Sequence, residues 1–129
     1  MIFSLAVYAP PSAQSNDSAY QFARAVLDSQ QHQLYRVFFY HEGVYTASLL
    51  NCPPQDEVDY TRRWQDLSIQ HNVDLVVCIA AALRRGIIDS TEADRYEKPV
   101  ANLAEHFSLS GLGQFVEASV KSDRLITFG

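Results

Sequence analysis

Cysteine is scarce in this sequence, which contains only Cys52 and Cys78 among its 129 residues. Two cysteines are too few to form a disulfide-stapled scaffold. In a reducing compartment both are expected to be free thiols. The fold is therefore expected to depend on an apolar core and not on disulfide bonds.

Basic residues are also few, with 10 Lys and Arg against 15 Asp and Glu and a formal net charge of -5. Affinity for a nucleic-acid backbone is built largely from clustered Lys and Arg. Only Arg62-Arg63 and Arg84-Arg85 form basic pairs. The charge balance argues against direct nucleic-acid binding by this chain.

Long apolar runs are missing, since no stretch approaches the ~20 residues of a membrane span. The N-terminal run Met1–Tyr8 has no basic region before it and is followed by Pro10-Pro11, so it predicts a first strand and not a secretory signal. We expect a cytoplasmic protein without membrane contact. The 47% hydrophobic and 19% charged residues are typical of a globular protein, and the length suits one domain over residues 1–129.

Common site motifs are absent as well. The sequence has no Walker loop and no Gly-x-Ser-x-Gly. Gly111-Leu112-Gly113 lacks the third glycine of the dinucleotide fingerprint, because Val116 stands in its place, so a tight turn is favoured. The four histidines have spacings that suit no zinc-ligand pattern. The sequence therefore predicts neither a cofactor nor a metal site.

Hydrophobic periodicity predicts alternating strands and helices. Strands are expected at Ile2–Tyr8, Leu34–Tyr40, Val73–Ile79, Phe107–Leu109 and Arg124–Phe128. Helices are expected after an N-cap at Asn16, Asp17 or Ser18, over Val44–Leu50 and Asp56–Gln70, between Cys78 and Gly86, after Asp89, and after an N-cap at Ser110 with the apolar stripe Leu112, Phe115, Val116 and Val120. This order predicts a three-layer, flavodoxin-like α/β fold with a mainly parallel five-stranded sheet and helices on both faces.

Cys78 lies where the β-branched run Val73–Ile79 meets an Ala-rich helical stretch. In open α/β sheets, ligands and chemistry collect at the carboxyl ends of the strands. A thiol there can lie near the positive end of a helix dipole, which favours a nucleophilic thiolate. Free cysteine is also a common core residue. Position alone leaves both interpretations open.

His41 and Glu42 follow the second predicted strand. In a parallel sheet they lie on the same rim as Cys78, where a histidine can shuttle a thiol proton. The alternative is a pair of solvent-facing loop residues. The sequence favours this plainer interpretation.

Three blocks resemble the DsrE-like sulfur-relay family of sulfurtransferases, which includes TusD. They are Phe38–Tyr45, Cys78–Gly86 and Phe107–Gly113. The resemblance extends over essentially the whole chain, and its most specific block matches the family's sulfur-carrying cysteine at Cys78. It implies a single DsrE-like domain over 1–129 with Cys78 as the catalytic residue. Cys52 matches no family motif and is expected to be structural.

The resemblance also implies a function and partners. A family member of this kind carries sulfane sulfur as a cysteine persulfide from TusA to TusE, in a heterohexamer with TusB and TusC. The sulfur is destined for 2-thiolation of the wobble uridine of tRNA. Arg84 and Arg85 either raise the potential around the sulfur anion or, as is favoured, face solvent or a partner.

One thiolate is sufficient for a carrier, because it attacks the outer sulfur of a donor persulfide and holds that sulfur until the next thiolate takes it. The mechanism requires the Cys78 sulfur to be reachable at the rim of the sheet. Two alternatives remain. One is a DsrE-type carrier in dissimilatory sulfur oxidation, and the other is a non-catalytic α/β interaction subunit with Cys78 in the core.

Overall fold

Five parallel strands form the centre of the molecule in the computed structural model, which describes residues 1–129. The strand order is β4-β3-β2-β1-β5, and every neighbouring pair is parallel. The strands are β1 (Ile2–Val7), β2 (Gln33–Phe39), β3 (Asp74–Cys78), β4 (Phe107–Ser110) and β5 (Arg124–Phe128). The predicted α/β fold with a parallel five-stranded sheet is confirmed.

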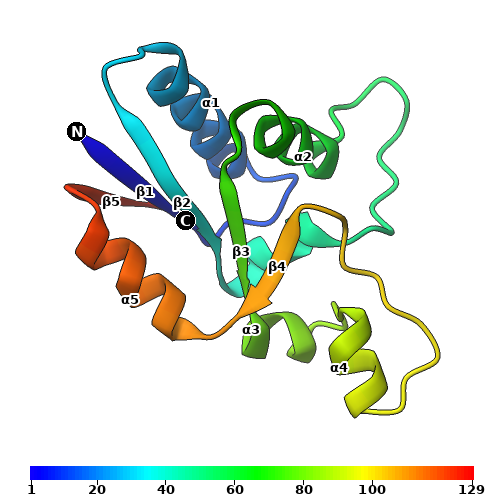
Figure 1. Cartoon of the computed structure of the whole chain (residues 1–129). Helices are drawn as coiled ribbons and strands as arrows, with labels where there is room; N and C mark the ends of the chain where they lie inside the picture. The colour runs from blue at the N-terminus through cyan, green and yellow to red at the C-terminus, as the bar shows by residue number, and fades with distance from the viewer.

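Helices lie on both faces of this sheet (Figure 1). They are α1 (Gln14–Asp28), the 3-10 helix η1 (His41–Ala47), α2 (Tyr60–His71), α3 (Ile79–Arg84), α4 (Ser90–Arg95) and α5 (Leu112–Lys121). α1 and α2 cover one face and α5 covers the other, while α3 and α4 lie near the carboxyl ends of β3 and β4. No helix has both the length and the apolar character that a membrane span requires.

The face of the sheet under α1 and α2 carries a dense aromatic core. Side chains alternate between the two faces along each strand. Phe39 of β2 packs edge-on against Trp64 of α2 at a ring-centroid distance of 5.4 Å and against Phe107 of β4 at 5.6 Å. Phe3 of β1 meets Phe22 of α1 at 5.4 Å. Burial of such large rings supplies much of the hydrophobic stabilisation of this layer.

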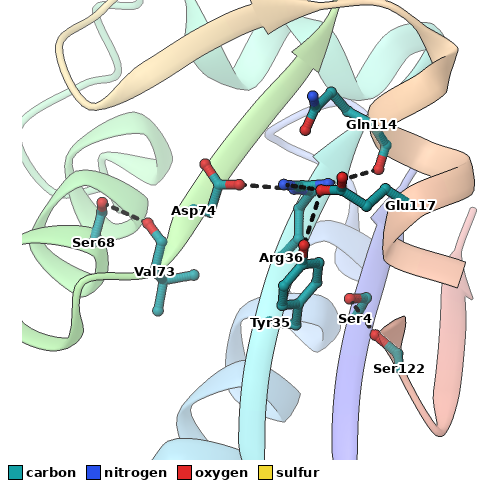
Figure 2. A network of polar contacts seen from close by, with 9 residues as sticks. All are labelled: Ser4, Tyr35, Arg36, Ser68, Val73, Asp74, Gln114, Glu117 and Ser122. Atoms are coloured by element: carbon teal, nitrogen blue, oxygen red, sulfur yellow. Dashed lines mark hydrogen bonds and ion pairs between the residues drawn. The ribbon is translucent and has the colours of Figure 1, made fainter. Parts of the chain in front are cut away.

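The opposite face holds a polar network that fastens α5 to the sheet (Figure 2). The Arg36 side chain on β2 is 8% exposed, and its Nε donates a hydrogen bond to Asp74 on β3 at 2.7 Å. Its guanidinium also donates to the Gln114 carbonyl at 2.8 Å and pairs with Glu117 at 3.0 Å, both on α5. The Tyr35 hydroxyl donates to the same Glu117 carboxylate at 2.9 Å.

These contacts shift the pKa values of Arg36 and Glu117. Burial alone would lower the pKa of Arg36, but the hydrogen bond to Asp74 and the nearby carboxylates outweigh it, so the pKa is raised. Hydrogen bonds from Tyr35 and Arg36 lower the pKa of Glu117. The Arg36 guanidinium and the Glu117 carboxylate are therefore held in their charged forms.

The start of α1 differs from the prediction, which placed the N-cap at Asn16, Asp17 or Ser18. The helix begins at Gln14 after Ala13. Asn16 is fully buried, where its amide donates to the Ala9 carbonyl at 3.1 Å and to Thr46 Oγ1 at 3.0 Å. Its side-chain oxygen accepts a hydrogen bond from Trp64 Nε1 at 3.2 Å. Asn16 therefore joins the loop after β1 to η1 and α2, and it does not cap a helix.

The predictions for α5 are also corrected in two respects. Its N-cap is Gly111, which offers no side-chain hydrogen bond, and not Ser110, which remains in β4. Of the predicted apolar stripe, Phe115 faces the sheet and packs on Phe38 at 5.0 Å. The other three members are exposed, namely Leu112 at 48%, Val116 at 58% and Val120 at 77%. The polar Arg36 network holds the helix where an apolar stripe was expected to do so.

The remaining boundaries shift by a few residues. The helix expected over Asp56–Gln70 starts at Tyr60, because Asp59 caps it by accepting from the Arg62 N–H at 3.1 Å. The one expected over Val44–Leu50 is the 3-10 helix η1 and begins at His41. Asp89 caps α4 as predicted. Gly86, with φ of 75°, follows α3 in the left-handed conformation typical of a helix C-terminus.

Candidate functional site

The five parallel strands end side by side at the carboxyl rim of the sheet. Cys78, the last residue of β3, is paired with Ser110 at the end of β4. On the other side, Phe39 of β2 pairs with Val77, which places Tyr40 beside Cys78. The Tyr40 N–H donates to the Val7 carbonyl of β1 at 3.0 Å. Cys78 therefore lies between Tyr40 and Ser110.

The ends of β3 and β4 lie where the direction of the chain across the sheet reverses. From β1 to β4 the chain moves across the sheet in one direction, and from β4 it returns to place β5 beside β1. Because parallel crossovers are right-handed, a reversal of direction sends the chain to the opposite face, which is where α5 lies. Ligands in open α/β sheets bind where neighbouring strands send their connections to opposite faces. Cys78 and Ser110 are the residues at that point.

The Cys78 side chain itself is buried. The thiol is free, and the residue is 2% exposed. Cys78 occupies the N-cap position of α3 but makes no capping hydrogen bond, and α3 has only six residues. Cys78 therefore lies at the rim as expected. Its sulfur, however, is covered in the single chain and is not reachable from solvent, contrary to expectation. Another molecule can react with the Cys78 sulfur only after the residues that cover it have moved.

His41 and Glu42 lie on the same rim, as a parallel sheet requires. The His41 ring stacks on Tyr40 at 4.3 Å with an interplanar angle of 11°, and it meets Tyr8 at 4.9 Å. Its backbone is left-handed, with φ of 49°, a conformation that costs a non-glycine residue free energy. No hydrogen bond joins His41 to the Cys78 sulfur, so the ring acts here as part of an aromatic cluster.

Glu42 makes an ion pair with Arg85, at 3.1 Å between Oε1 and Nη2. Arg85 also donates to the Ala81 carbonyl at 3.1 Å, which ties η1 to α3. Arg84 is exposed and makes no ion pair. Of the two arginines, Arg84 faces solvent as expected, and Arg85 binds a carboxylate of its own chain.

Cys52 is exposed and lies in the segment between η1 and α2. It lines a surface cavity of about 250 Å³ together with Pro11, Pro53 and Tyr60. No group of three or more His, Cys, Asp and Glu side chains gathers in a way that could hold a metal ion.

Two features of the site were not found from the sequence. One is Ser110, whose partnership with Cys78 appears only in the strand register. The other is Arg36, which anchors the first turn of α5 through the Gln114 carbonyl. A single arginine inside the apolar strand Leu34–Tyr40 was the available signal, because a buried charge requires a partner.

Comparison with known proteins decides the family. The chain matches the DsrE/DsrF-like family over residues 1–128. It belongs to this family. Among relatives in the family, the chain is 54% identical over 129 residues to "Sulfurtransferase TusD" of Salmonella arizonae, covering 99% of this chain and 100% of that protein. It is 50% identical over 120 residues to a DsrE protein of Allochromatium vinosum, covering 93% and 92%.

Solved structures agree with the family fold. The ychN protein of E. coli superposes with a TM-score of 0.74 at 20% sequence identity, covering 98% of this chain and 97% of that one. MTH1491 of Methanobacterium thermoautotrophicum superposes with a TM-score of 0.65 at 15% identity and the same coverage. At these identities the likeness concerns the fold alone. It supports the DsrE-like architecture.

Proposed function

We propose that the chain is a sulfurtransferase subunit that carries sulfane sulfur as a persulfide on Cys78. The observation that carries the proposal is the 54% identity, over the full length, to a relative named Sulfurtransferase TusD. The position of Cys78 at the β3–β4 switch point supports it, because chemistry in parallel sheets concentrates there. Residues 1–129 act as one domain in this role.

The transfer is a thiol–disulfide type of exchange. The Cys78 thiolate attacks the outer sulfur of a donor persulfide, R–S–SH, and the donor S–S bond breaks with its electron pair leaving on R–S⁻. The product is Cys78–S–SH, and a second thiolate later takes the outer sulfur in the same way. Sulfur moves without net oxidation or reduction, and a single carrier thiol is sufficient.

Burial of Cys78 sets a requirement on this mechanism. With 2% exposure in the single chain, the sulfur must be uncovered by local opening or by docking of a partner. A thiol that stays covered belongs to the alternative, a non-catalytic interaction subunit. Loading with sulfur therefore separates the two functions.

The experiment is to incubate the protein with a small-molecule persulfide and measure its intact mass. We expect Cys52→Ser to gain one sulfur atom and the double variant Cys52→Ser/Cys78→Ser to gain none. Cys52 is replaced in both proteins because its exposed thiol would itself take up sulfur. The carrier function is refuted if Cys52→Ser gains no sulfur, or if the double variant gains as much as Cys52→Ser.

In the fuller proposal the donor is TusA and the acceptor is TusE, and the chain works in a cytoplasmic heterohexamer with TusB and TusC. The sulfur then goes to the 2-position of the wobble uridine of tRNA. Co-purification of TusB-like and TusC-like chains tests the assembly. Transfer from the loaded protein to purified TusE tests the direction.

A DsrE-type carrier in sulfur oxidation is the second candidate, favoured by the 50% identity to the Allochromatium vinosum DsrE protein. Both functions use the same chemistry at Cys78, so the acceptor distinguishes them. Loss of tRNA 2-thiouridine after deletion of the gene supports the tRNA relay. Unchanged 2-thiouridine supports the oxidation pathway.

A further inference from the structure

The first turn of α5 crosses over the end of β3. Ser110 belongs to β4, on one side of Cys78. Five residues later, the Phe115 ring packs on Phe38 and lies 6.5 Å from the Tyr40 ring, on the other side of Cys78. The intervening segment, Gly111–Gln114, must therefore pass over the strand that lies between them.

Cys78 points toward the face that this segment covers. Side chains two residues apart on a strand share a face, so Asp74, Val76 and Cys78 of β3 lie on the same face. Asp74 binds Arg36, whose guanidinium also binds Gln114 and Glu117 of α5 (Figure 2). The thiol and the start of α5 therefore face one another.

This end of α5 offers unsatisfied backbone donors. The N-cap Gly111 provides no side-chain hydrogen bond. The Gln114 N–H bonds the Gly111 carbonyl at 3.1 Å, but the Leu112 and Gly113 N–H groups have no acceptor within the helix. α5 has ten residues, so its dipole adds positive potential at the same place. A buried thiol without a hydrogen bond faces this donor-rich turn.

The two glycines keep the turn open. A Cβ added at Gly111 or Gly113 would meet no atom within 4 Å, and neither residue has a left-handed φ. Neither crowding nor backbone conformation in this chain requires glycine at these positions. The turn therefore carries no side-chain cover at these two exposed positions.

We propose that Ser110 and the first turn of α5, Gly111–Gln114, form the anion site for the outer sulfur of the Cys78 persulfide. The inference rests on the proposed function. After exchange, the outer sulfur lies about 2 Å beyond Cys78 Sγ. When its proton leaves to solvent it becomes Cys78–S–S⁻, and the Ser110 hydroxyl and the N–H groups of Leu112 and Gly113 donate hydrogen bonds to it.

The site has a consequence for transfer. Stabilising the anion keeps the outer sulfur deprotonated and directs it along the turn, where Leu112 is exposed. An acceptor thiolate that docks at this end of α5 then meets the outer sulfur before the Cys78 sulfur. The turn thus acts as a positioning element for the sulfur that is to be transferred.

The test uses the near-ultraviolet absorbance of the persulfide anion on the loaded full-length Cys52→Ser protein, followed as a function of pH. All further substitutions are made in this background, because the exposed Cys52 thiol would add a second persulfide. Ser110→Ala removes the hydroxyl. Leu112→Pro removes one backbone N–H, and the extended Gly111, with φ of -80° and ψ of 177°, tolerates a following proline. We expect each variant to raise the pH midpoint of the absorbance by roughly half a unit to one unit, the range for one hydrogen bond or dipole contact.

Matched variants isolate these effects. Ser108→Ala removes a hydroxyl from the same strand and face, opposite Val76 and two residues from Ser110, and should leave the midpoint unchanged. Leu112→Ala reports loss of the side chain, so the difference between Leu112→Pro and Leu112→Ala reports the N–H. If Leu112→Pro fails to fold by circular dichroism, Gly113→Pro with Gly113→Ala takes its place.

The outcomes separate the two proposals. The anion site is overturned if the pH midpoint is the same in Ser110→Ala and Ser108→Ala and is also the same in Leu112→Pro and Leu112→Ala. The carrier function is left intact by that result. Absence of loading in Cys52→Ser refutes the carrier function itself. A midpoint that rises only in Ser110→Ala and the proline variants supports the site, because a purely structural role would not move a persulfide titration selectively.

Discussion

Arg36 is expected to be the most important polar residue for the attachment of α5. Its side chain is 8% exposed and binds Asp74, Glu117 and the Gln114 carbonyl at 2.7, 3.0 and 2.8 Å. Replacement by methionine keeps most of the apolar volume and removes all three interactions. The variant Arg36→Met therefore measures the network with little effect on packing.

The magnitude follows from the exposure of the partners. Hydrogen bonds to charged groups contribute about 1.5 to 3 kcal/mol each when the partner is left buried and unpaired. The Asp74 and Glu117 side chains are 46% and 45% exposed, so water replaces much of what they lose. The Gln114 carbonyl keeps the Ala118 N–H of its own helix as a partner and loses only its second hydrogen bond. With about 0.5 to 1 kcal/mol for each of the three interactions, we expect Arg36→Met to lower the free energy of unfolding by about 1.5 to 3 kcal/mol, equivalent to about 6 to 11 °C.

The assay is urea unfolding followed by circular dichroism, with Arg62→Met as the matched control. Arg62 pairs with Asp66 on the surface of α2 at 3.1 Å, and its side chain is 71% exposed. Such a pair contributes a few tenths of a kcal/mol. The reasoning is wrong if Arg36→Met and Arg62→Met lower the unfolding free energy equally.

The same network makes a prediction about pH. The pKa of Glu117 is lower in the folded chain than its ordinary value of 4.5, because Tyr35 and Arg36 donate hydrogen bonds to its carboxylate. The unfolded chain therefore takes up this proton first as the pH falls. The contribution of Glu117 to stability is complete above its ordinary pKa and is lost as the pH falls through the folded value. Glu117→Gln should remove that part of the acid sensitivity, and unchanged sensitivity would contradict the assignment.

Three further predictions concern burial and close approach. In the native protein, iodoacetamide should label exposed Cys52 at least about tenfold faster than Cys78, measured by peptide mass spectrometry, and equal rates would contradict the covered thiol. Asn16→Ala should lower the unfolding free energy by about 3 kcal/mol in urea titration, because three buried hydrogen bonds are lost, whereas a change below about 1 kcal/mol would contradict the role of Asn16. Gly43→Ala should disrupt the packing of η1, since the new Cβ would clash with the Val7 carbonyl, and a thermal midpoint equal to wild type would exclude this.

The fold class was predictable because it depends on periodicity. The apolar run of β3 and the alternating strands and helices along the chain are local signals, and each gave the correct element. Helix starts were less predictable. Asn16 has the chemistry of an N-cap, but contacts with Thr46 and Trp64, 30 and 48 residues away, give it a buried position.

The position of the candidate site residue Cys78 was predictable from the sequence, but its surroundings were not. Cys78 ends a strand, and its position on the rim follows from the parallel sheet. The burial of Cys78 depends on the segment Ser110–Phe115, which begins beside Cys78 and ends against Tyr40. The burial therefore results from the ends of β2, β3 and β4 together. The Arg36 network likewise joins residues 38 and 78 positions apart, which no periodicity reports.

The low exposure of Cys78 also bears on oxidative damage. A thiol that peroxide cannot reach is not converted to sulfinic or sulfonic acid, products from which a sulfur carrier does not recover. In the proposed carrier function, an empty Cys78 thiol is therefore protected from inactivation until a donor arrives. The surface thiol of Cys52 is the one that such oxidants meet first.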